Sequence, residues 1–512
     1  MANQDPIELN LFSSRVSAIC DEMGLVLKRA AFSPNIKDRL DYSCAIFDRN
    51  GEMFAQADHM PVHLGSMAYA MHKIVQGVEW KQGDYLVLND PYLGGTHLPD
   101  VTVISPVHLN GVQLVGFVVN RAHHANIGCD TPGSMPISSH LEEEGLVIPP
   151  IFLVRNGKVQ QNAARLLGIQ EDELTGDFAA QIGANQIGST RLEQLVKKMG
   201  LGLYERRIRQ LNDLAEGFAL IAISKLKPGM YRFLDYLDDD GCGTNNIKLA
   251  VHIHITSDSA ILDFTESSCM VKGNLNCPEA VVAAASFYCF RCLMPSYTPA
   301  CHGLFRKIKI KTLEGSILNA KRPAAVAAGN VETSMRLVDL IFGALSKAST
   351  ELIPAAGQGT MNNLAMGLIS SNKNMRWDYY ETVAGGTGGG PNYPGLDGKH
   401  SHMTNTLNTP IESLEMHYPL RINRYEIRDH SGGAGQNRGG NGIVREYEFL
   451  DDARVTILSE RRCRGPWGLK GGKPGNPGKN LLNGNTLPSK CSFAVNEGDK
   501  LEIITPGGGG WG

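Results

Sequence analysis

The segment from Leu86 to Asp130 holds four side chains that are well suited to bind a metal ion. They are His97, Asp100, His123 and His124. Imidazole nitrogens and carboxylate oxygens are ligands for Zn²⁺, Mn²⁺ and Fe²⁺, and a mixed set of this kind can leave positions open for water or substrate. A metal site is therefore the first chemistry that the sequence predicts, provided that the fold brings these residues together.

The same segment contains a signal for the element that would bring them together. Val101–Val107 and Leu114–Val119 are two runs rich in apolar and β-branched residues, with Pro106 as the one interruption. Between them lies Asn110-Gly111, a dipeptide that favours the positive φ angles of a two-residue hairpin turn. We therefore predict a β-hairpin whose open end carries the candidate ligands.

A two-residue turn at this dipeptide fixes the register of the hairpin. Asp100 is then expected opposite Arg121, and His97 opposite His124, with His123 next to it. The glycines and the proline around His97 make that strand end irregular. Alternation of side chains along the strand therefore leaves open whether His123 or His124 faces the site.

A second Asn-Gly hairpin is predicted nearer the N-terminus. Its strands are Tyr42–Phe47 and Met53–Ala57, and its turn contains Asn50-Gly51. Asp41 lies at the mouth of this hairpin, as Asp100 lies at the mouth of the first. A carboxylate at the start of a strand is commonly a turn or capping residue, so Asp41 is a candidate ligand with a structural alternative.

Several other polar residues have both a site role and a structural role open to them. His59 and His63 flank a proline ahead of a predicted helix, where they are candidate ligands or buried structural histidines. The acidic run Glu142–Glu144 either ends a helix in solvent or turns one carboxylate to the site. His252 and His254 alternate along a predicted strand, a spacing shared by chelating pairs and by solvent-facing pairs.

Composition argues against several classes of protein. The 512 residues carry a formal net charge of −3 with no basic tail, so no nucleic-acid partner is expected. No run of about eighteen apolar residues is present, so no membrane span is expected. The chain opens without a leader-like segment, and its 11 cysteines are scattered, which predicts reduced thiols and a cytoplasmic location.

The chain is long enough for several domains, and its patterns predict a mixed α/β (α+β), multi-domain fold. We expect an N-terminal region whose helix and β-hairpins form the metal site, a helical segment, a central α/β region and a glycine-rich, β-rich C-terminal region that packs against the N-terminal site. These regions are residues 1–165, 166–228, 229–380 and 381–512.

Periodicity places the individual elements. Apolar residues at helical spacing predict helices over 7–31, 66–76, 279–293 and 332–349, and over 171–222 with a break near Gly200. Strand patterns cover 231–264, 304–318, 418–428 and 455–460.

Glycine gathers in the last quarter of the chain, above all in Ala384–Pro410. These loops contain no GxxxxGK[ST] phosphate motif. They are either backbone that needs positive φ in tight turns, or a pocket lined by backbone amides and polar side chains. In the second case the substrate-binding side chains are His400, His402, Asn405 and Arg438. Trp511 follows four glycines and is expected to dock onto the fold.

Many short motifs of the chain, taken in order, resemble the hydantoinase B/oxoprolinase family over nearly the whole length. They include NIKDRLDYSCAIFD, NDPYLGGTHLPDVTV, RAHHANIGCDTPGSMP, PLRINRYEIRDHSGGAGQNRGG and the terminal TPGGGGWG. This family includes the metal-binding subunits of ATP-dependent hydantoinases and lactamases, and it is related to subunits of acetone and acetophenone carboxylases.

The resemblance implies a divalent metal ion, with Zn²⁺ as the first expectation and Mn²⁺ or Fe²⁺ as alternatives. The residues that match the family's ligands are Asp41, His97, Asp100 and His123. The resemblance thus selects His123 over His124 as the ligand. We expect His124 and Glu144 as catalytic residues beside the ion.

The resemblance also implies a partner and a reaction. The partner is a hydantoinase A-type chain that binds ATP and Mg²⁺, in a hetero-oligomer such as α2β2. The substrate is a small cyclic amide (a hydantoin, N-methylhydantoin, 5-oxoproline or another lactam), activated by phosphorylation and then opened by a metal-bound water. The alternatives are a subunit of an ATP-dependent ketone carboxylase and a non-catalytic structural subunit.

Overall fold

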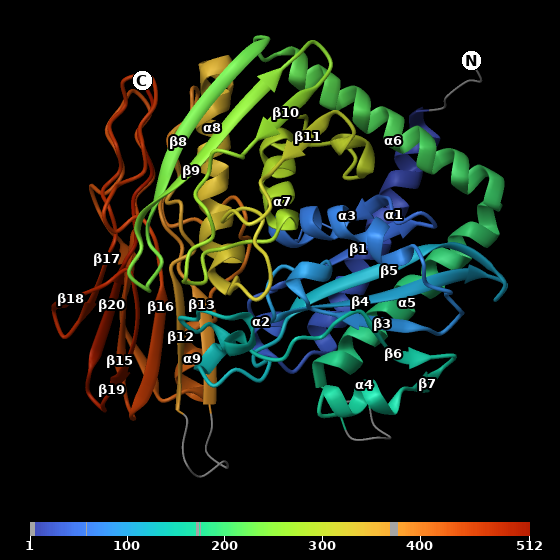
Figure 1. The fold of residues 1–512 in the computed structure, drawn as a ribbon, viewed down its shortest axis with the longest axis horizontal. Helices are drawn as coiled ribbons and strands as arrows, with labels where there is room; N and C mark the ends of the chain where they lie inside the picture. The colour runs from blue at the N-terminus through green and yellow to red at the C-terminus, as the bar shows by residue number, and fades with distance from the viewer. Residues whose placement is uncertain (1–5, 58, 170–173, 175, 369–376) are drawn as a thin grey trace. The chain divides into compact units, whose positions relative to one another are not determined.

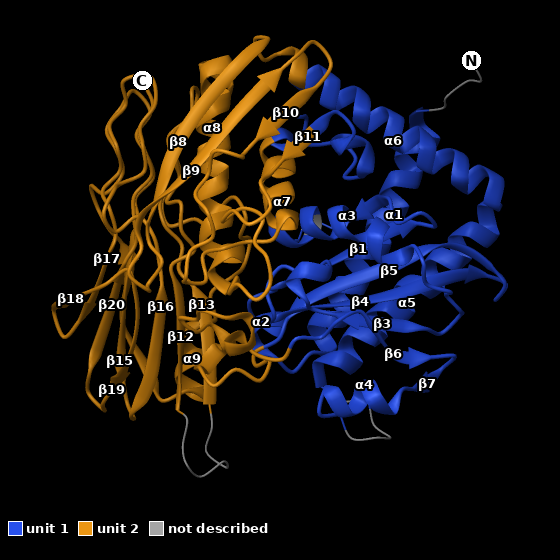
Figure 2. Ribbon diagram, in the orientation of Figure 1, with its two compact units in different colours: residues 1–124, 147–222, 290–308 blue, residues 125–146, 223–289, 309–512 orange. Residues whose placement is uncertain are grey.

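The computed structural model describes residues 6–57, 59–169, 174, 176–368 and 377–512 (Figure 1). Helices and strands both make up a large part of the chain, so the predicted mixed helix-and-sheet class is confirmed. The chain divides into two compact units, each assembled from three separate stretches (Figure 2). Unit 1 comprises residues 1–124, 147–222 and 290–308, and unit 2 comprises residues 125–146, 223–289 and 309–512. The division into four regions stays a prediction.

Unit 1 is built on a seven-stranded sheet with the order β2-β1-β5-β4-β3-β6-β7. Its strands are β1 (Tyr42–Asp48), β2 (Met53–Gln56), β3 (Tyr85–Leu88), β4 (Asp100–Leu109), β5 (Gln113–His123), β6 (Ile151–Arg155) and β7 (Lys158–Val159). Its helices are α1 (Pro6–Ala30), α2 (Pro34–Lys37), α3 (Pro61–Val75), α4 (Gln161–Leu166), α5 (Gly176–Met199) and α6 (Leu201–Ser224), the last of which ends two residues into unit 2.

Both predicted hairpins are present, but the register of the β4–β5 hairpin differs from the prediction. Asn110 and Gly111 adopt positive φ angles of 52° and 74°, as the turn requires. The ladder begins with Leu109 opposite Gln113, which leaves Val112 as an extra residue, and a bulge between Val107 and His108 adds another. Each insertion shifts the pairing by one residue. The pairing is therefore shifted by two residues at the far end of the hairpin.

The two faces of this sheet bury different elements. Alternate residues of the central strands, among them Ala45, Ile104 and Val119, pack with α3 residues such as Met67 and Met71 in one apolar cluster. On the opposite face, polar side chains of α5 donate hydrogen bonds to backbone carbonyls of the sheet. Gln181 Nε2 donates to the Val101 carbonyl, and Asn185 Nδ2 donates to the Val103 carbonyl.

Unit 2 contains three sheets, with the orders β11-β10-β9-β8, β13-β12-β16-β19 and β14-β15-β20-β17-β18. The strands are β8 (Gly229–Asp239), β9 (Asn245–Ile255), β10 (Ala260–Asp263), β11 (Ile308–Lys311), β12 (Asn363–Leu368), β13 (Trp377–Thr382), β14 (Leu420–Ile427), β15 (Ile443–Phe449), β16 (Ala453–Leu458), β17 (Lys479–Leu482), β18 (Asn485–Leu487), β19 (Lys490–Val495) and β20 (Lys500–Ile504). The helices are α7 (Glu279–Arg291), α8 (Ser334–Ala348) and α9 (Ile411–His417).

Most predicted elements are confirmed, with two corrections, and the first residues of the helical stretch predicted over 171–222 lie outside the described part of the chain. The helix predicted from residue 66 begins at Pro61, because proline is well tolerated in the first turn of a helix. Of the strands predicted over 304–318, only β11 forms. Trp511 is 3% exposed and pairs with Asn437 and Leu469, so the terminal segment docks as expected. None of the helices in the described part of the chain is long and apolar enough to cross a membrane.

Candidate metal centre

Three candidate ligands form a row across three neighbouring strands. Asp100, the first residue of β4, is the direct partner of His123, the last residue of β5. Asp41 immediately precedes β1, and its carbonyl accepts a hydrogen bond from the His123 backbone amide at 3.0 Å. Paired residues of antiparallel strands point to the same face. The row therefore lies on the face that α3 covers.

His97 joins this row from the loop that precedes β4. Asn89 holds the loop, since its Nδ2 donates to the Leu98 carbonyl at 2.8 Å and its Oδ1 accepts from the Ile148 amide at 2.7 Å. The loop passes so close to the backbone that a Cβ on Gly95 would lie 2.1 Å from the Asn89 carbonyl oxygen. Only glycine fits there without displacing the chain. The glycine-rich motif thus fixes the position of His97.

One ligand atom from each of His97, Asp100 and His123 can be chosen so that all three lie within 4.8 Å of one another. This is the one group of three or more potential ligands within that distance among the described residues. The side chains are almost fully buried, at 1%, 0% and 2% exposure. An ion with bonds of about 2.1 Å holds its ligands within roughly 4 Å of one another. Small side-chain adjustments therefore suffice, and the donor set fits Zn²⁺, Mn²⁺ or Fe²⁺.

Burial and mutual contact control the charge of these groups. Burial lowers the pKa of His123 well below its usual range, which keeps the ring neutral as a metal ligand must be. Burial acts to raise the pKa of Asp100, but His63 and His97 hold that pKa well below its ordinary value. Burial raises the pKa of Asp41, and the neighbouring His63 and Arg39 act in the opposite direction. The group thus combines neutral imidazole with an ionised carboxylate.

Asn35 orients the His123 ring from the other side. Its side-chain amide nitrogen lies 3.0 Å from His123 Nδ1, and its oxygen accepts from Arg39 at 3.3 Å. This contact holds the imidazole ring in one orientation. Asn35 belongs to the motif NIKDRLD, but nothing in its spacing alone indicates this contact.

Sequence reasoning left the role of His63 open, and the structure brings it to the row. His63 lies in the first turn of α3 and is 1% exposed. Its Nε2 is 3.1 Å from Asp100 Oδ2 and 3.9 Å from Asp41 Oδ1. His59 is placed differently, since its Nδ1 accepts a hydrogen bond from the Cys44 amide and its ring packs on Tyr42.

His124 lies on the opposite face of the sheet. Its Nε2 is 2.9 Å from Gln181 Oε1, and its ring packs 4.8 Å from that of Phe178 on α5. Successive strand residues point to opposite faces, so His123 and His124 are separated by the sheet. The catalytic role predicted for His124 stays a prediction.

Glu144 belongs to unit 2 and is fully buried. Its Oε1 accepts three hydrogen bonds, from Ser138 Oγ at 2.8 Å and from the amides of Val326 and Ala327 at 2.9 Å each. These bonds tie two segments of unit 2 together. The catalytic role of Glu144 also stays a prediction.

The four predicted substrate-binding residues lie in the glycine-rich loops of unit 2. His400 Nε2 is 3.3 Å from Asn408 Oδ1, and His402 Nδ1 is 3.4 Å from the Tyr288 hydroxyl. Asn405 is exposed. Arg438 forms a two-pronged ion pair with Asp397, at 2.7 and 3.0 Å. Their role in substrate binding stays a prediction.

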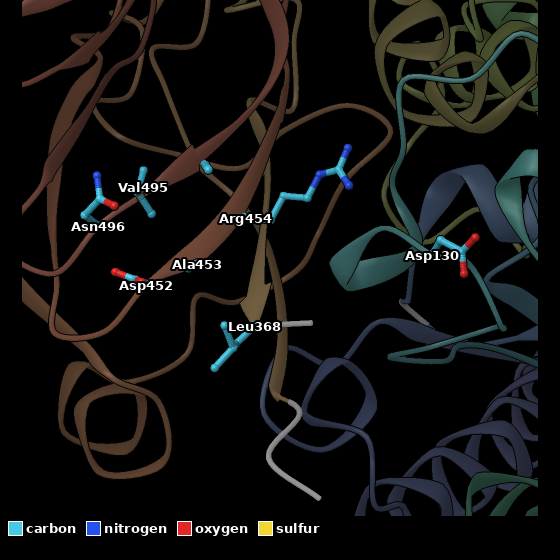
Figure 3. A pocket seen from close by; sticks show the side chains of 8 residues that line it. Asp130, Leu368, Asp452, Ala453, Arg454, Val495 and Asn496 are labelled. Carbon is cyan, nitrogen blue, oxygen red and sulfur yellow. The ribbon is translucent and has the colours of Figure 1, made fainter. Parts of the chain in front are cut away.

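Two pockets lie away from these residues. The larger, in unit 2, has a volume of about 570 Å³ and is lined by Asp130, Leu368, Arg454 and neighbouring residues (Figure 3). The smaller, in unit 1, has about 220 Å³ and lies near the turn end of β4, with His108 and Glu193 in its wall. No predicted site residue lines either pocket. Of the other candidate metal pair, His252 Nε2 lies 3.1 Å from Glu266 Oε1, and His254 is exposed.

Comparison with known proteins places this geometry in context. The family model described as Hydantoinase B/oxoprolinase matches residues 5–512. The 5-oxoprolinase of Dictyostelium discoideum is 40% identical over 526 residues, which cover 99% of this chain and 40% of that protein. A Pseudomonas protein described as one subunit of a D-/L-hydantoinase is 31% identical over 538 residues, covering 99% and 90%. The chain thus spans about two fifths of the length of this oxoprolinase.

Two solved structures have the same fold. The ATP-dependent caprolactamase from Pseudomonas jessenii matches with a TM-score of 0.89 and 26% sequence identity, covering 100% of this chain and 91% of that chain. The nucleotide-free acetone carboxylase structure matches with a TM-score of 0.86 at 18% identity, covering 99% and 76%. The second likeness concerns the fold alone.

Proposed function

Because the chain belongs to the hydantoinase B/oxoprolinase family, we propose that it is the metal-binding part of an ATP-dependent enzyme that hydrolyses a cyclic amide. The observation that carries this proposal is the buried group of His97, Asp100 and His123. The substrate class is supported by the names of relatives, 5-oxoprolinase and hydantoinase, and by the fold shared with a caprolactamase.

Four residues are proposed to hold the ion, with Zn²⁺ preferred and Mn²⁺ or Fe²⁺ as alternatives. They are Asp41, His97, Asp100 and His123. When bound, a divalent cation there supplies Lewis-acid polarisation and lowers the pKa of a coordinated water. The surrounding residues exclude bulk water, since all four side chains are at most 5% exposed. Asn35 and Thr96 orient His123 and Asp100 through hydrogen bonds of 3.0 and 2.9 Å.

The remaining chemistry is assigned to residues whose roles rest on the sequence. Proton transfer is proposed for His124 and Glu144. Substrate binding is proposed for His400, His402, Asn405 and Arg438. Each assignment predicts that replacement by alanine changes turnover while the ion stays bound.

An ATP-binding chain or domain of the hydantoinase A type is proposed to complete the enzyme, in a hetero-oligomer such as α2β2. The similarity to a protein described as one subunit of a hydantoinase supports a separate partner. The partner binds ATP and Mg²⁺ and transfers a phosphoryl group to the amide oxygen of the substrate. This transfer makes the ring carbon a better electrophile, because an amide carbonyl is otherwise a poor one. Water then adds to that carbon and the ring C–N bond breaks, which leaves an acyl phosphate on the opened chain. A second water hydrolyses this acyl phosphate to the carboxylate and phosphate.

The test is ring opening by the chain assembled with its ATP-binding partner. Hydantoin, N-methylhydantoin, 5-oxoproline and caprolactam are each supplied with ATP, and the ring-opened product and ADP are measured before chelation, after chelation and after return of the ion. We expect product only when both ATP and the ion are present. Incorporation of labelled bicarbonate into product would instead support a carboxylase. Normal turnover by the His97→Ala complex would support a structural subunit.

A further inference from the structure

Strand β14 forms an open edge of the five-stranded sheet of unit 2. The order of that sheet is β14-β15-β20-β17-β18, and among the described residues β14 pairs with β15 alone. Leu420 is the one buried residue of the strand, and the residues from Asn423 to Ile427 are all exposed. An exposed strand edge carries unpaired backbone groups and can pair with a strand of another chain. This edge is therefore a candidate surface for association.

Two residues of β14 direct their backbone groups to the open edge. The Arg428 amide, one residue beyond the strand, donates to the Gly442 carbonyl on the β15 side at 2.9 Å. The pairing with β15 is regular from Arg424 to Ile427, so the hydrogen-bonding groups alternate between the two sides residue by residue. The N–H and C=O groups of Tyr425 and Ile427 therefore point away from β15, to the side where another strand could pair.

Exposed apolar side chains adjoin this edge. Tyr425 and Ile427 are 45% and 42% exposed, and Met416 and Leu407 are 78% and 54% exposed. Met416 belongs to α9, which is hydrogen-bonded to β14. Leu407 precedes Asn408, whose side-chain oxygen accepts a hydrogen bond from the Tyr425 hydroxyl at 3.2 Å. A strand added at this edge would remove part of this apolar surface from water, which favours association.

The charges along β14 indicate which strand fits there. In an antiparallel pair, positions whose backbone groups face the partner strand lie opposite positions of the same kind, so a twofold axis between two β14 strands passes through a residue. With the axis at Tyr425, Arg424 of each copy lies opposite Glu426 of the other. With the axis at Arg424 or at Glu426, like charges lie opposite each other. Opposite charges across an antiparallel pair stabilise it and like charges destabilise it.

We propose that β14 is the contact surface between two copies of this chain, which pair antiparallel about Tyr425 and join their five-stranded sheets into one. A second copy is the occupant because the charges of the strand complement the same strand in reverse, as a twofold interface requires. The proposed hetero-oligomer contains two copies of the chain. The inference itself depends neither on the metal site nor on the reaction catalysed there.

The first test is the oligomeric state of charge-reversed full chains, measured by sedimentation velocity. Glu426→Arg leaves two arginines beside Tyr425, and Arg424→Glu leaves two glutamates. Each variant alone should dimerise roughly 10- to 100-fold more weakly than the wild type, because two cross-strand pairs become repulsive at once. An equimolar mixture of the two variants should recover the dimer, since every pair across its axis is then of opposite charge. Glu497→Arg, at an exposed position of the same unit, is the matched control and should dimerise as the wild type does.

The second test is disulfide cross-linking, which reports the register. Residue 425 lies on the axis, where the two Cα atoms of a hydrogen-bonded pair are about 5.5 Å apart, within the range of a disulfide. Tyr425→Cys should therefore form a linked dimer on mild oxidation. Asn423→Cys is the control on the same strand, because its two copies would lie about 13 Å apart along the strands. It should form no more linked dimer than the wild type, which has exposed cysteines of its own.

Three results would overturn the inference. The first is a wild-type chain that stays monomeric alone and gives no Tyr425→Cys dimer in the assembled enzyme. The second is a dimer that persists in both charge variants, with equal cross-linking of Tyr425→Cys and Asn423→Cys. The third is a link from Tyr425→Cys to the ATP-binding chain, which would make that chain the occupant. Where a charge variant does not fold, the cross-linking result decides. A chain that dimerises as expected but opens no cyclic amide would contradict only the proposed function.

Discussion

Asp100 and His123 are direct cross-strand partners, at the first position of β4 and the last position of β5. This pairing places a carboxylate and an imidazole side by side on the sheet face covered by α3. The adjacent residue, His124, is turned to the other face and meets Gln181. Two consecutive histidines therefore belong to different environments, which makes them a matched pair for experiment.

Replacement of His123 by alanine should abolish metal binding, whereas replacement of His124 should not. We expect a loss of affinity above about 100-fold for His123→Ala, since changes to the partners of ligands alone cost about 10- to 100-fold. The metal affinity of His124→Ala should stay within a few-fold of that of the wild type. Metal content after dialysis, measured by mass spectrometry, separates the two. Retained metal in His123→Ala would remove this residue from the ligand set.

Replacement of Gly95 by alanine should destabilise unit 1 and weaken metal binding. The added Cβ would lie 2.1 Å from the Asn89 carbonyl oxygen, so the loop that carries His97 must move. Overpacking of this kind costs about 1–3 kcal/mol.

The control for this change is Gly217→Ala in α6, where an added Cβ meets nothing within 4 Å. Alanine in a helix interior should stabilise the protein by about 1 kcal/mol relative to glycine. Urea unfolding measures both variants. Equal effects would show that the close approach at Gly95 does not constrain the loop.

Glu332 should make the protein less stable as pH rises. Burial raises the pKa of Glu332 from 4.5 to about 7, with the charge of Glu460 contributing. Between these values the folded state keeps a proton that the unfolded state has released. The free energy of unfolding should therefore fall as pH increases from about 4.5 to 7, by about 3 kcal/mol in total.

Glu332→Gln should remove this part of the pH dependence, because the amide does not titrate. Glu314→Gln, at an exposed position of unit 2, should leave it unchanged. Unfolding curves at several pH values measure the difference. An unchanged slope in Glu332→Gln would mean that Glu332 is ionised in the folded protein.

Removal of the ion should stop catalysis without unfolding the chain. The candidate ligands lie at the ends of strands whose apolar cluster with α3 does not involve the ion. Added metal at about 100 times its Kd should stabilise the folded state by about 2.7 kcal/mol through binding alone. Circular dichroism before and after chelation checks this expectation. Loss of secondary structure on chelation would make the ion structural.

Local patterns predicted much of the fold, because Asn-Gly turns and helical periodicity are properties of short segments. The same patterns predicted that Asp41 and Asp100 lie at the open ends of two hairpins. The predicted register of the β4–β5 hairpin was wrong by two residues. The extra residues, at Val112 and within β5, cannot be recognised from the hydrophobic pattern. The contact of His63 with Asp100 could not be predicted, because it depends on how α3 packs across the sheet. The choice of His123 rested on family resemblance, and the pairing with Asp100 now gives it a physical reason.

The most direct measurement is an anomalous-scattering map of crystals of the Zn²⁺-loaded protein, recorded on both sides of the zinc edge. We predict one ion per chain, at about 2.0–2.2 Å from ligand atoms of Asp41, His97, Asp100 and His123. An ion bound elsewhere, or none among these four residues, would contradict the account.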